Sequence, residues 1–302
     1  MKNTRHQIAG FTITELLIAT ALGLVLITGM ISVFIGSKRS SELNSALSDM
    51  QESARFALDA IARDVRMAGF QGCIDLNTQS ATILADAPPT SNLVNSIVTG
   101  SVVVTSDTWV PAPPLTFIYP PADIEPVAGT HTLALQFGSA LTSELSGPMF
   151  AAGNSFAAPI PIADNNTQLD DGDLAIISDC DTADLFRVSS APEGAGEVTH
   201  LAIDNNSGNL SKAYGDASTI DQTKVMKFQS NVYFVADTKE TNQHGDPLRS
   251  LYVQTLPYEM DNPPTELVQG IENFRVRFGI RQNNGALAYY TANQPGLSLI
   301  HI

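Results

Sequence analysis

The chain opens with an uninterrupted apolar run. Between Phe11 and Ser37 only Glu15 is charged, and Leu16–Ser37 supplies 22 uncharged, mainly apolar residues before Lys38 and Arg39 end the run. About 20 such residues in a helix cross the roughly 30 Å hydrocarbon core of a bilayer. The pattern therefore predicts a membrane helix or a signal sequence.

The helical pattern continues beyond this membrane-length run. No proline occurs before Pro88, and Gly69 and Gly72 supply stop signals. The predicted helix extends from Phe11 to Ala68, about 87 Å at 1.5 Å per residue. Arg55, Asp59 and Arg63 follow one another at i, i+4 on its polar face. The opposite, apolar stripe recurs at steps of three and four and consists of Leu43, Leu47, Met50, Ala54, Ala57, Ile61, Val65 and Ala68.

The pattern changes to β-structure after Cys73. All 17 prolines lie there, and alternating or β-branched runs replace the helical stripe. Composition predicts loops at Asp107–Pro114, Gly138–Gln168 and Asp237–Asp246. The predicted fold class is α+β, a long N-terminal helix packed on one face of a β-rich head. The predicted strands are Ile97–Thr105, Leu115–Tyr119, Thr132–Phe137, Leu174–Ser178, Leu185–Ser189, Val198–Ile203, Val225–Ala236, Leu251–Leu256 and Phe274–Ile280.

The net charge of the chain limits the kinds of ligand that it is expected to bind. The chain of 302 residues is 16% charged and carries a net charge of -15. A nucleic-acid ligand is not expected, because phosphate binding needs a basic face. We interpret the acidity as that of a solvated, exposed surface.

The residues before the apolar run differ from a conventional secretory signal, whose cleavage site follows the apolar core. Here a leader that contains Lys2 and Arg5 ends at Gly10, directly before the core, and Glu15 lies five residues further on. A carboxylate at membrane depth is costly, so Glu15 needs a partner or a function. Cleavage after Gly10 would create such a partner, the free amine of Phe11. The alternative is a signal anchor whose Glu15 lies among the lipid headgroups.

The sequence Gly10-Phe11-Thr12-Ile13-Thr14-Glu15 resembles the type III signal of type IV pilins and type II secretion pseudopilins. The resemblance implies leader cleavage by prepilin peptidase between Gly10 and Phe11, N-methylation of Phe11, and an assembly role for Glu15. It covers roughly residues 1–40. Ala54–Cys73, ARFALDAIARDVRMAGFQGC, is more similar to PilW-like minor pilins of the type IV pilus than to major pilins. Gly172–Val188 and Thr265–Ile280 carry weaker similarity.

The C-terminus departs from this family. Its members continue past a segment like Tyr289–Gln294 into a further strand, whereas here only PGLSLIHI follows. We therefore expect a truncated C-terminus in which residues 295–302 are not native.

Two cysteines, Cys73 and Cys180, lie beyond the apolar run. An oxidising compartment would let them pair, because Cys73 follows the helix stop and Cys180 follows the apolar run Leu174–Ile177. We predict a disulfide between them that ties the end of the helix to the sheet. The alternative is two separate buried thiols.

Other constellations do not support catalysis. The chain has no HExxH pair, nucleophile elbow, phosphate loop or dinucleotide fingerprint, so neither an enzyme nor a cofactor is predicted. We interpret the turns with Asp164, Asp170–Asp173 and Asp204–Gly208 as backbone features, since they lack the ligand order of an EF-hand. An ion site there is the alternative, and no metal ligands are assigned.

These observations predict a structural protein with four segments. Residues 1–10 are the leader, residues 11–37 the transmembrane and assembly half of the helix, residues 38–70 its amphipathic half, and residues 71–302 the head. We expect a minor pilin that initiates or caps a type IV pilus and partners other pilin subunits through the helix. Its head would face the periplasm from the inner membrane before assembly and lie outside the cell afterwards. The alternatives are a type II secretion pseudopilin and a membrane-tethered periplasmic binding protein.

Overall fold

The computed structural model describes residues 12–75, 79–90, 93–112, 124–149, 155–241, 245–256, 262–282 and 284–292. The chain divides into two compact units, residues 1–53 and residues 54–302. The predicted leader, the predicted strand Leu115–Tyr119 and the C-terminal residues 295–302 lie outside the described residues.

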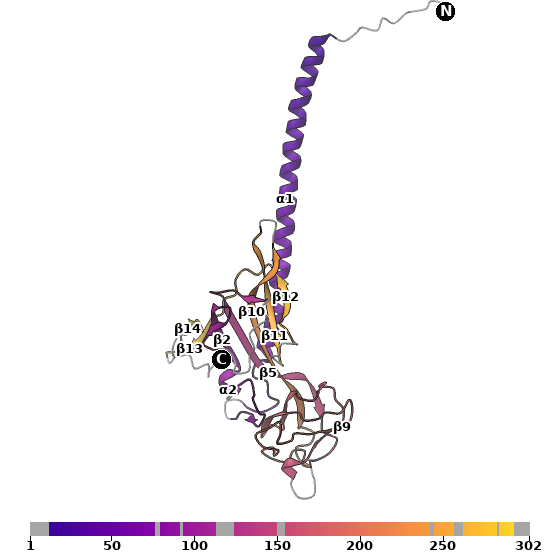
Figure 1. The fold of residues 1–302 in the computed structure, drawn as a ribbon, viewed down its shortest axis with the longest axis vertical. Coiled ribbons are helices and arrows are strands. Elements are labelled where there is room, and N and C mark those ends of the chain that lie inside the picture. The colour runs from indigo at the N-terminus through magenta and orange to yellow at the C-terminus, as the bar shows by residue number, and fades with distance from the viewer. Residues whose placement is uncertain are drawn as a thin grey trace, which may run out of the picture. The chain divides into compact units, whose positions relative to one another are not determined.

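One long helix, α1 (Ile13–Met67), forms the N-terminal element, coloured indigo in Figure 1. The predicted helix is confirmed within one residue at its C-terminal end. There Gly69 adopts a φ of +80°, and the Phe70 amide bonds the Met67 carbonyl at 2.8 Å. Both features are typical of a helix end, where glycine takes the left-handed conformation at no steric cost.

The C-terminal part of α1 packs against the head by a narrow face. Ala57 is 6% exposed, and Ile61, Met67 and Ala68 contact the apolar core of the sheet. Val65 belongs to the predicted apolar stripe, but its side chain is 46% exposed. The polar side chain of Asp64 turns to the sheet at this level of the helix, because strand β10 (Lys224–Thr241) offers it hydrogen-bond donors.

The head contains a large sheet of ten strands and two small two-stranded sheets. In the large sheet the order is β1-β8-β7-β10-β5-β2-β3, while β11 and β4 also pair with β10, and β12 pairs with β11. Only β1 and β8 are parallel among these pairs. The small sheets are β6–β9 and β13–β14.

The short helices are α2 (Leu93–Ser96) and η1 (Ser155–Ala157). The strands are β1 (Thr82–Ile83), β2 (Val98–Thr105), β3 (Thr108–Val110), β4 (Glu125–Pro126), β5 (His131–Glu144), β6 (Ile160–Ile162), β7 (Leu174–Ser178), β8 (Ala183–Arg187), β9 (Gly196–Val198), β10 (Lys224–Thr241), β11 (Pro247–Thr255), β12 (Thr265–Gln269), β13 (Phe278–Arg281) and β14 (Leu287–Tyr290).

Strand β10 is the axis of the head. Its first residues, Lys224–Lys227, pair with β7, and its later residues pair with β11, so these two strands follow each other along one side of β10. Strand β5 pairs along the other side, from Lys224 to Tyr233. Because β10 has 18 residues and β5 has 14, both are long enough to run through two regions of the head.

The two regions have separate apolar cores. Residues 145–223, which we call the β7–β8 lobe, surround a core built from β6, β7, β8, β9 and the loops after them. The helix-side sheet is made of β2, β3, β5, β11, β12 and the later part of β10. Apolar clusters on one of its faces pack against α1, and a separate cluster around Trp109 and Phe234 contains no residue of α1. In Figure 1 β9 marks the β7–β8 lobe and β12 lies beside α1.

The strand prediction was most accurate for β7, which is apolar almost throughout and has the predicted bounds. Strand β2 agrees with its prediction within one residue, β11 begins earlier than predicted, and β5 and β10 are longer than predicted. Residues 138–144 and 237–241 were predicted as loops but continue β5 and β10, because each finds a paired neighbour. Most of the predicted strand Val198–Ile203 is instead a turn after β9, and only the end of Phe274–Ile280 forms a strand, β13.

Candidate assembly site

The first described residues of α1 form a capping box. Thr12 precedes the helix, and its hydroxyl accepts a hydrogen bond from the Glu15 amide at 3.3 Å. In return, one Glu15 carboxylate oxygen accepts hydrogen bonds from the Thr12 amide at 3.0 Å and the Thr12 hydroxyl at 2.9 Å. This reciprocal arrangement satisfies donors that a helix N-terminus otherwise leaves unpaired. Gly10 and Phe11, the predicted cleavage residues, lie outside the described residues.

Beyond this cap, the first half of α1 presents exposed apolar side chains on all sides. Within the described part of the chain α1 is the one helix long and apolar enough to cross a membrane. Two hydroxyl groups in this half bond within the helix: the Thr28 hydroxyl donates to the Leu24 carbonyl at 2.8 Å, and the Ser32 hydroxyl donates to the Thr28 carbonyl at 2.9 Å. Such internal bonds are what a lipid environment demands of polar groups.

A polar anchor joins the C-terminal part of α1 to the sheet. One Asp64 carboxylate oxygen accepts hydrogen bonds from the Asn231 side-chain amide at 2.6 Å and from the Tyr233 hydroxyl at 2.5 Å. Both donors belong to β10, and Tyr233 is 3% exposed. Burial, followed by the hydrogen bond to Asp64, raises the pKa of Tyr233 well above its ordinary value. Because hydrogen bonds are directional, the anchor fixes the position of the helix along β10 in a way that apolar contact alone does not.

The end of α1 continues directly into backbone pairing with β5. The Gly69 amide donates to the Gln136 carbonyl at 2.8 Å, and the Gly138 amide donates to the Phe70 carbonyl at 2.5 Å. Gly138 has space for this approach because it has no side chain; a Cβ there would lie 2.5 Å from the Met226 sulfur. The helix end is therefore held to the middle of the sheet by main-chain bonds.

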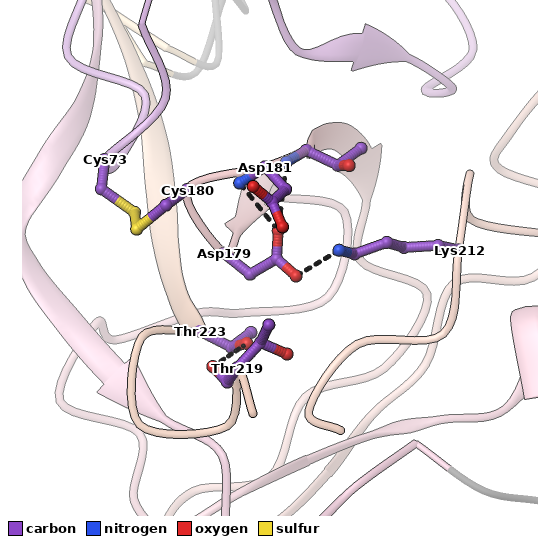
Figure 2. Close-up of a disulfide and its surroundings, with 8 residues drawn as sticks. Cys73, Asp179, Cys180, Asp181, Lys212, Thr219 and Thr223 are labelled. Atoms are coloured by element: carbon purple, nitrogen blue, oxygen red, sulfur yellow. Dashed lines mark hydrogen bonds and ion pairs between the residues drawn. A yellow bond between two sulfur atoms is a disulfide. The ribbon is translucent and has the colours of Figure 1, made fainter. Parts of the chain in front are cut away.

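A disulfide lies just beyond this contact and joins Cys73 to Cys180 with a Cα–Cα distance of 4.4 Å, as predicted (Figure 2). Cys180 adopts a φ of +70° in the turn between β7 and β8. Gly72, with a φ of +86°, passes so close to Ser178 that a Cβ would lie 2.6 Å from the serine hydroxyl oxygen. The covalent bond thus connects the chain that leaves α1 to the turn of the β7–β8 hairpin.

A buried ion pair braces the same turn from the other side. One oxygen of the Asp179 carboxylate accepts hydrogen bonds from the Asp181 and Thr182 amides at 3.3 and 3.1 Å, and the other pairs with the Lys212 ammonium (Figure 2). The Asp179 side chain is fully buried, whereas that of Lys212 is 29% exposed. The Lys212 ammonium also lies 5.4 Å from the centre of the Tyr214 ring, within range of a cation–π contact.

Asp184, on β8, holds the following loop to the core of the lobe. One of its carboxylate oxygens accepts hydrogen bonds from the Ser211 amide and hydroxyl, both at 2.8 Å, and from the Tyr214 hydroxyl at 3.0 Å. Asp184 and Tyr214 have no exposed surface. Burial raises the pKa of Asp184, with the hydrogen bonds partly opposing it, and burial also raises the pKa of Tyr214. His200 lies in the same core, and burial lowers its pKa.

The acidic side chains in the turns of the head contact groups of their own chain, namely a backbone amide, a lysine and a serine hydroxyl. Asp171 accepts a hydrogen bond from the Ala191 amide at 2.9 Å, and Asp173 pairs with Lys227 at 2.6 Å. Asp204 accepts a hydrogen bond from the Ser189 hydroxyl. Within the ranges that the structure describes, no group of three or more metal-ligating side chains comes together. These contacts account for the acidic residues as turn and brace elements.

Comparisons with protein-family models, curated proteins and solved structures found no match. The architecture itself is pilin-like: a long apolar N-terminal helix precedes a β-rich domain that carries a disulfide.

Glu15 and both cysteines were predicted from the sequence, but three residues that join separate elements, Asp64, Asp184 and Lys212, were not. Asp64 had a visible signal, since a charged residue three positions after Ile61 and four before Ala68 shares their helical face. The Thr-x-x-Glu spacing of the capping box was also visible. Asp184 and Lys212 gave no local signal, because their partners are distant in sequence.

Proposed function

We propose that this chain is a minor pilin-like structural subunit that helps to initiate or cap a type IV pilus. Glu15 and the cleaved N-terminus of Phe11 would be its assembly groups. Other pilin subunits would be its partners, and prepilin peptidase its processing enzyme. It would act without catalysis and without a cofactor.

The observation that carries this proposal is the construction of α1. One helix of 55 residues combines a capped start, a membrane-length apolar half and a C-terminal part anchored to the head. A simple membrane anchor has no need of the third part. In a filament, the apolar surface that lipid covers before assembly would be covered by neighbouring helices, so the same residues serve both states.

Under this proposal the protein lies in the inner membrane before assembly, with its head in the periplasm, and in an extracellular filament afterwards. The disulfide is consistent with such an oxidising environment. A type II secretion pseudopilin would share the signal, the helix and the head, so the genes beside this one would separate the two alternatives.

The decisive experiment is the mass of the N-terminal peptide of protein recovered from its native membrane. We expect the mature chain to begin at Phe11, with an added methyl group. Gly10→Val keeps the leader charge and the apolar core, and serves as a matched control that we expect to remain uncleaved. A mature wild-type chain that began near Ser37 would identify an ordinary signal peptide and would contradict the proposal.

A further inference from the structure

The disulfide provides a second covalent connection between α1 and the β7–β8 lobe, in addition to the main chain. Cys73 lies six residues after Met67, the last residue of α1, and its partner Cys180 lies 107 residues further along the sequence. Strands β1 to β7 all lie inside this closed loop. A force that enters at Cys180 therefore reaches the end of α1 through one covalent bond, without passing along the enclosed segment.

The Cys180 turn is firmly attached to the lobe that surrounds it. Asp179, beside Cys180, bonds two amides of the turn and the Lys212 ammonium. Strand β8, which follows the turn, is held to the loop around Ser211 by the buried Asp184. A load on the lobe is thus shared between the hairpin and the loop before it reaches the disulfide.

The contacts that hold the enclosed segment to α1 are of another kind. Strand β5 meets the end of α1 through two main-chain hydrogen bonds, those of Gly69 and Gly138, and through apolar contacts with Ile61, Met67 and Ala68. All of these contacts break without a covalent change. If load passed through β5, the sheet that packs against α1 would be the first part to open.

We propose that the Cys73–Cys180 disulfide is a mechanical clamp that carries tension from the β7–β8 lobe directly to α1 and keeps residues 74–179 folded under load. The inference rests on the proposed function, because a filament subunit is pulled between its helix and its head.

Ile203 provides a suitable point of attachment on this lobe. Its side chain is 83% exposed, and its turn is fixed by Asn205, which is 3% exposed. The Asn205 side-chain oxygen accepts a hydrogen bond from the Arg187 amide at 2.7 Å, and its amide group donates to the Arg187 carbonyl at 3.0 Å. A handle at this position would pull on β8, the strand that follows the disulfide turn.

The test is single-molecule force spectroscopy on the purified full chain in detergent, with handles at Ser41→azidophenylalanine and Ile203→azidophenylalanine. With the disulfide intact, about 55 residues can extend, about 32 between Ser41 and Cys73 and about 23 between Cys180 and Ile203, roughly 190 Å at 3.5 Å per residue. After reduction with dithiothreitol, about 162 residues between Ser41 and Ile203 can extend, roughly 570 Å. We expect this nearly threefold increase in extension, with the long events at forces at which the oxidised protein stays short.

The matched control moves the second handle to Val104→azidophenylalanine, on the helix-side sheet and inside the closed loop. Val104 is 52% exposed, and about 63 residues separate it from the handle at Ser41 whether the disulfide is present or not. Extension should then be roughly 220 Å in both redox states. The variant with both Cys73→Ser and Cys180→Ser should reproduce the reduced wild-type chain at both handles.

Two outcomes would overturn the clamp. One is an unchanged extension on reduction when the chain is pulled at Ile203, which would mean that non-covalent contacts carry the load. The other is an equal effect of reduction at Ile203 and Val104, which would mean that the bond stabilises the whole head without directing force. Neither outcome bears on cleavage before Phe11, so failure of the clamp is separate from failure of the proposed function.

Discussion

The hydroxyl of Tyr233 on β10 donates a hydrogen bond to the carboxylate of Asp64 on α1 at 2.5 Å. The two residues are 169 positions apart, and Asn231 adds a second hydrogen bond to the same oxygen. The anchor is therefore a direct link between the helix and the central strand of the head.

Removal of this link should destabilise the head without disturbing its apolar packing. Tyr233→Phe keeps the ring and removes one charge-assisted hydrogen bond, which costs about 1.5–3 kcal/mol in comparable cases. We expect the urea midpoint to fall by the corresponding amount. In a double-mutant cycle, the effects of Tyr233→Phe and Asp64→Asn should not add, because both change the same bond. Additive effects would show that the hydrogen bond contributes nothing to stability.

Two buried tyrosines predict a loss of stability in alkaline solution. The pKa values of Tyr214 and Tyr233 are raised in the folded protein, first by burial and then by the nearby carboxylates. Their stabilising effect is complete below the unfolded pKa of about 10 and is lost as pH rises above that value. Each should contribute a slope of about 1.4 kcal/mol per pH unit.

The measurement is urea unfolding at several pH values above 9. Tyr214→Phe and Tyr233→Phe should each make the decline in unfolding free energy less steep than in the wild type, since each removes one titrating group. Deprotonation of lysines affects all the proteins alike, so the comparison isolates the tyrosines. Equal slopes in the variants and the wild type would contradict the prediction.

Substitutions of Glu15 separate its charge from its capping role. Glu15→Gln keeps a side chain suited to the capping box but removes the negative charge, whereas Thr12→Ala weakens the cap and keeps the charge. We expect Glu15→Gln and Glu15→Ala to insert into the membrane but to be depleted from sheared filaments, as expected if the carboxylate neutralises a neighbour's amine. Thr12→Ala should be incorporated nearly normally. The reverse order would assign Glu15 to helix capping alone.

A pair of glycines tests the tight approach beside the disulfide. Gly72 and Gly129 have nearly the same φ, +86° and +83°, but a Cβ at Gly72 would lie 2.6 Å from the Ser178 hydroxyl oxygen, whereas nothing lies within 4 Å at Gly129. Gly129→Ala should cost only the backbone strain, about 1 kcal/mol. Gly72→Ala should cost an additional 1–3 kcal/mol or so from overpacking, measured by thermal unfolding. Equal costs would mean that Ser178 moves aside freely.

The parts of the fold that the sequence predicted are those with a local cause. The length of α1 follows from an apolar run, an amphipathic stripe and the glycines that end it, and β7 is an apolar run whose bounds were predicted. The stripe did not show which α1 side chains are buried, because the position of a helix on a sheet depends on the facing strand: Asp64 turns to β10, whereas Val65 stays exposed. The continuation of β5 beyond Phe137 likewise depends on pairing with residues 80 or more positions away.

The residues of the candidate site that were predicted also have a local cause. Glu15 was recognised from the residues beside it, and the two cysteines were paired because the chain has only two. The brace between Asp179 and Lys212 depends on contact between a hairpin turn and a later loop. A contact between residues so far apart leaves no periodic pattern in the sequence, so it could be found only in the structure.

Strand β10 contributes a side chain to each of the five apolar clusters of the head: Val225, for example, packs into the core of the β7–β8 lobe, and Val235 packs into the cluster that contains Ala57 of α1. Neither core can be completed until this strand is in place, and its partners β5 and β7 are both synthesised earlier and must wait for it. The head should therefore fold as one cooperative unit and only after β10 has been synthesised, since its longest-range pairings set the pace. A cut of the chain between the β7–β8 lobe and the helix-side sheet would leave neither of them with a complete core.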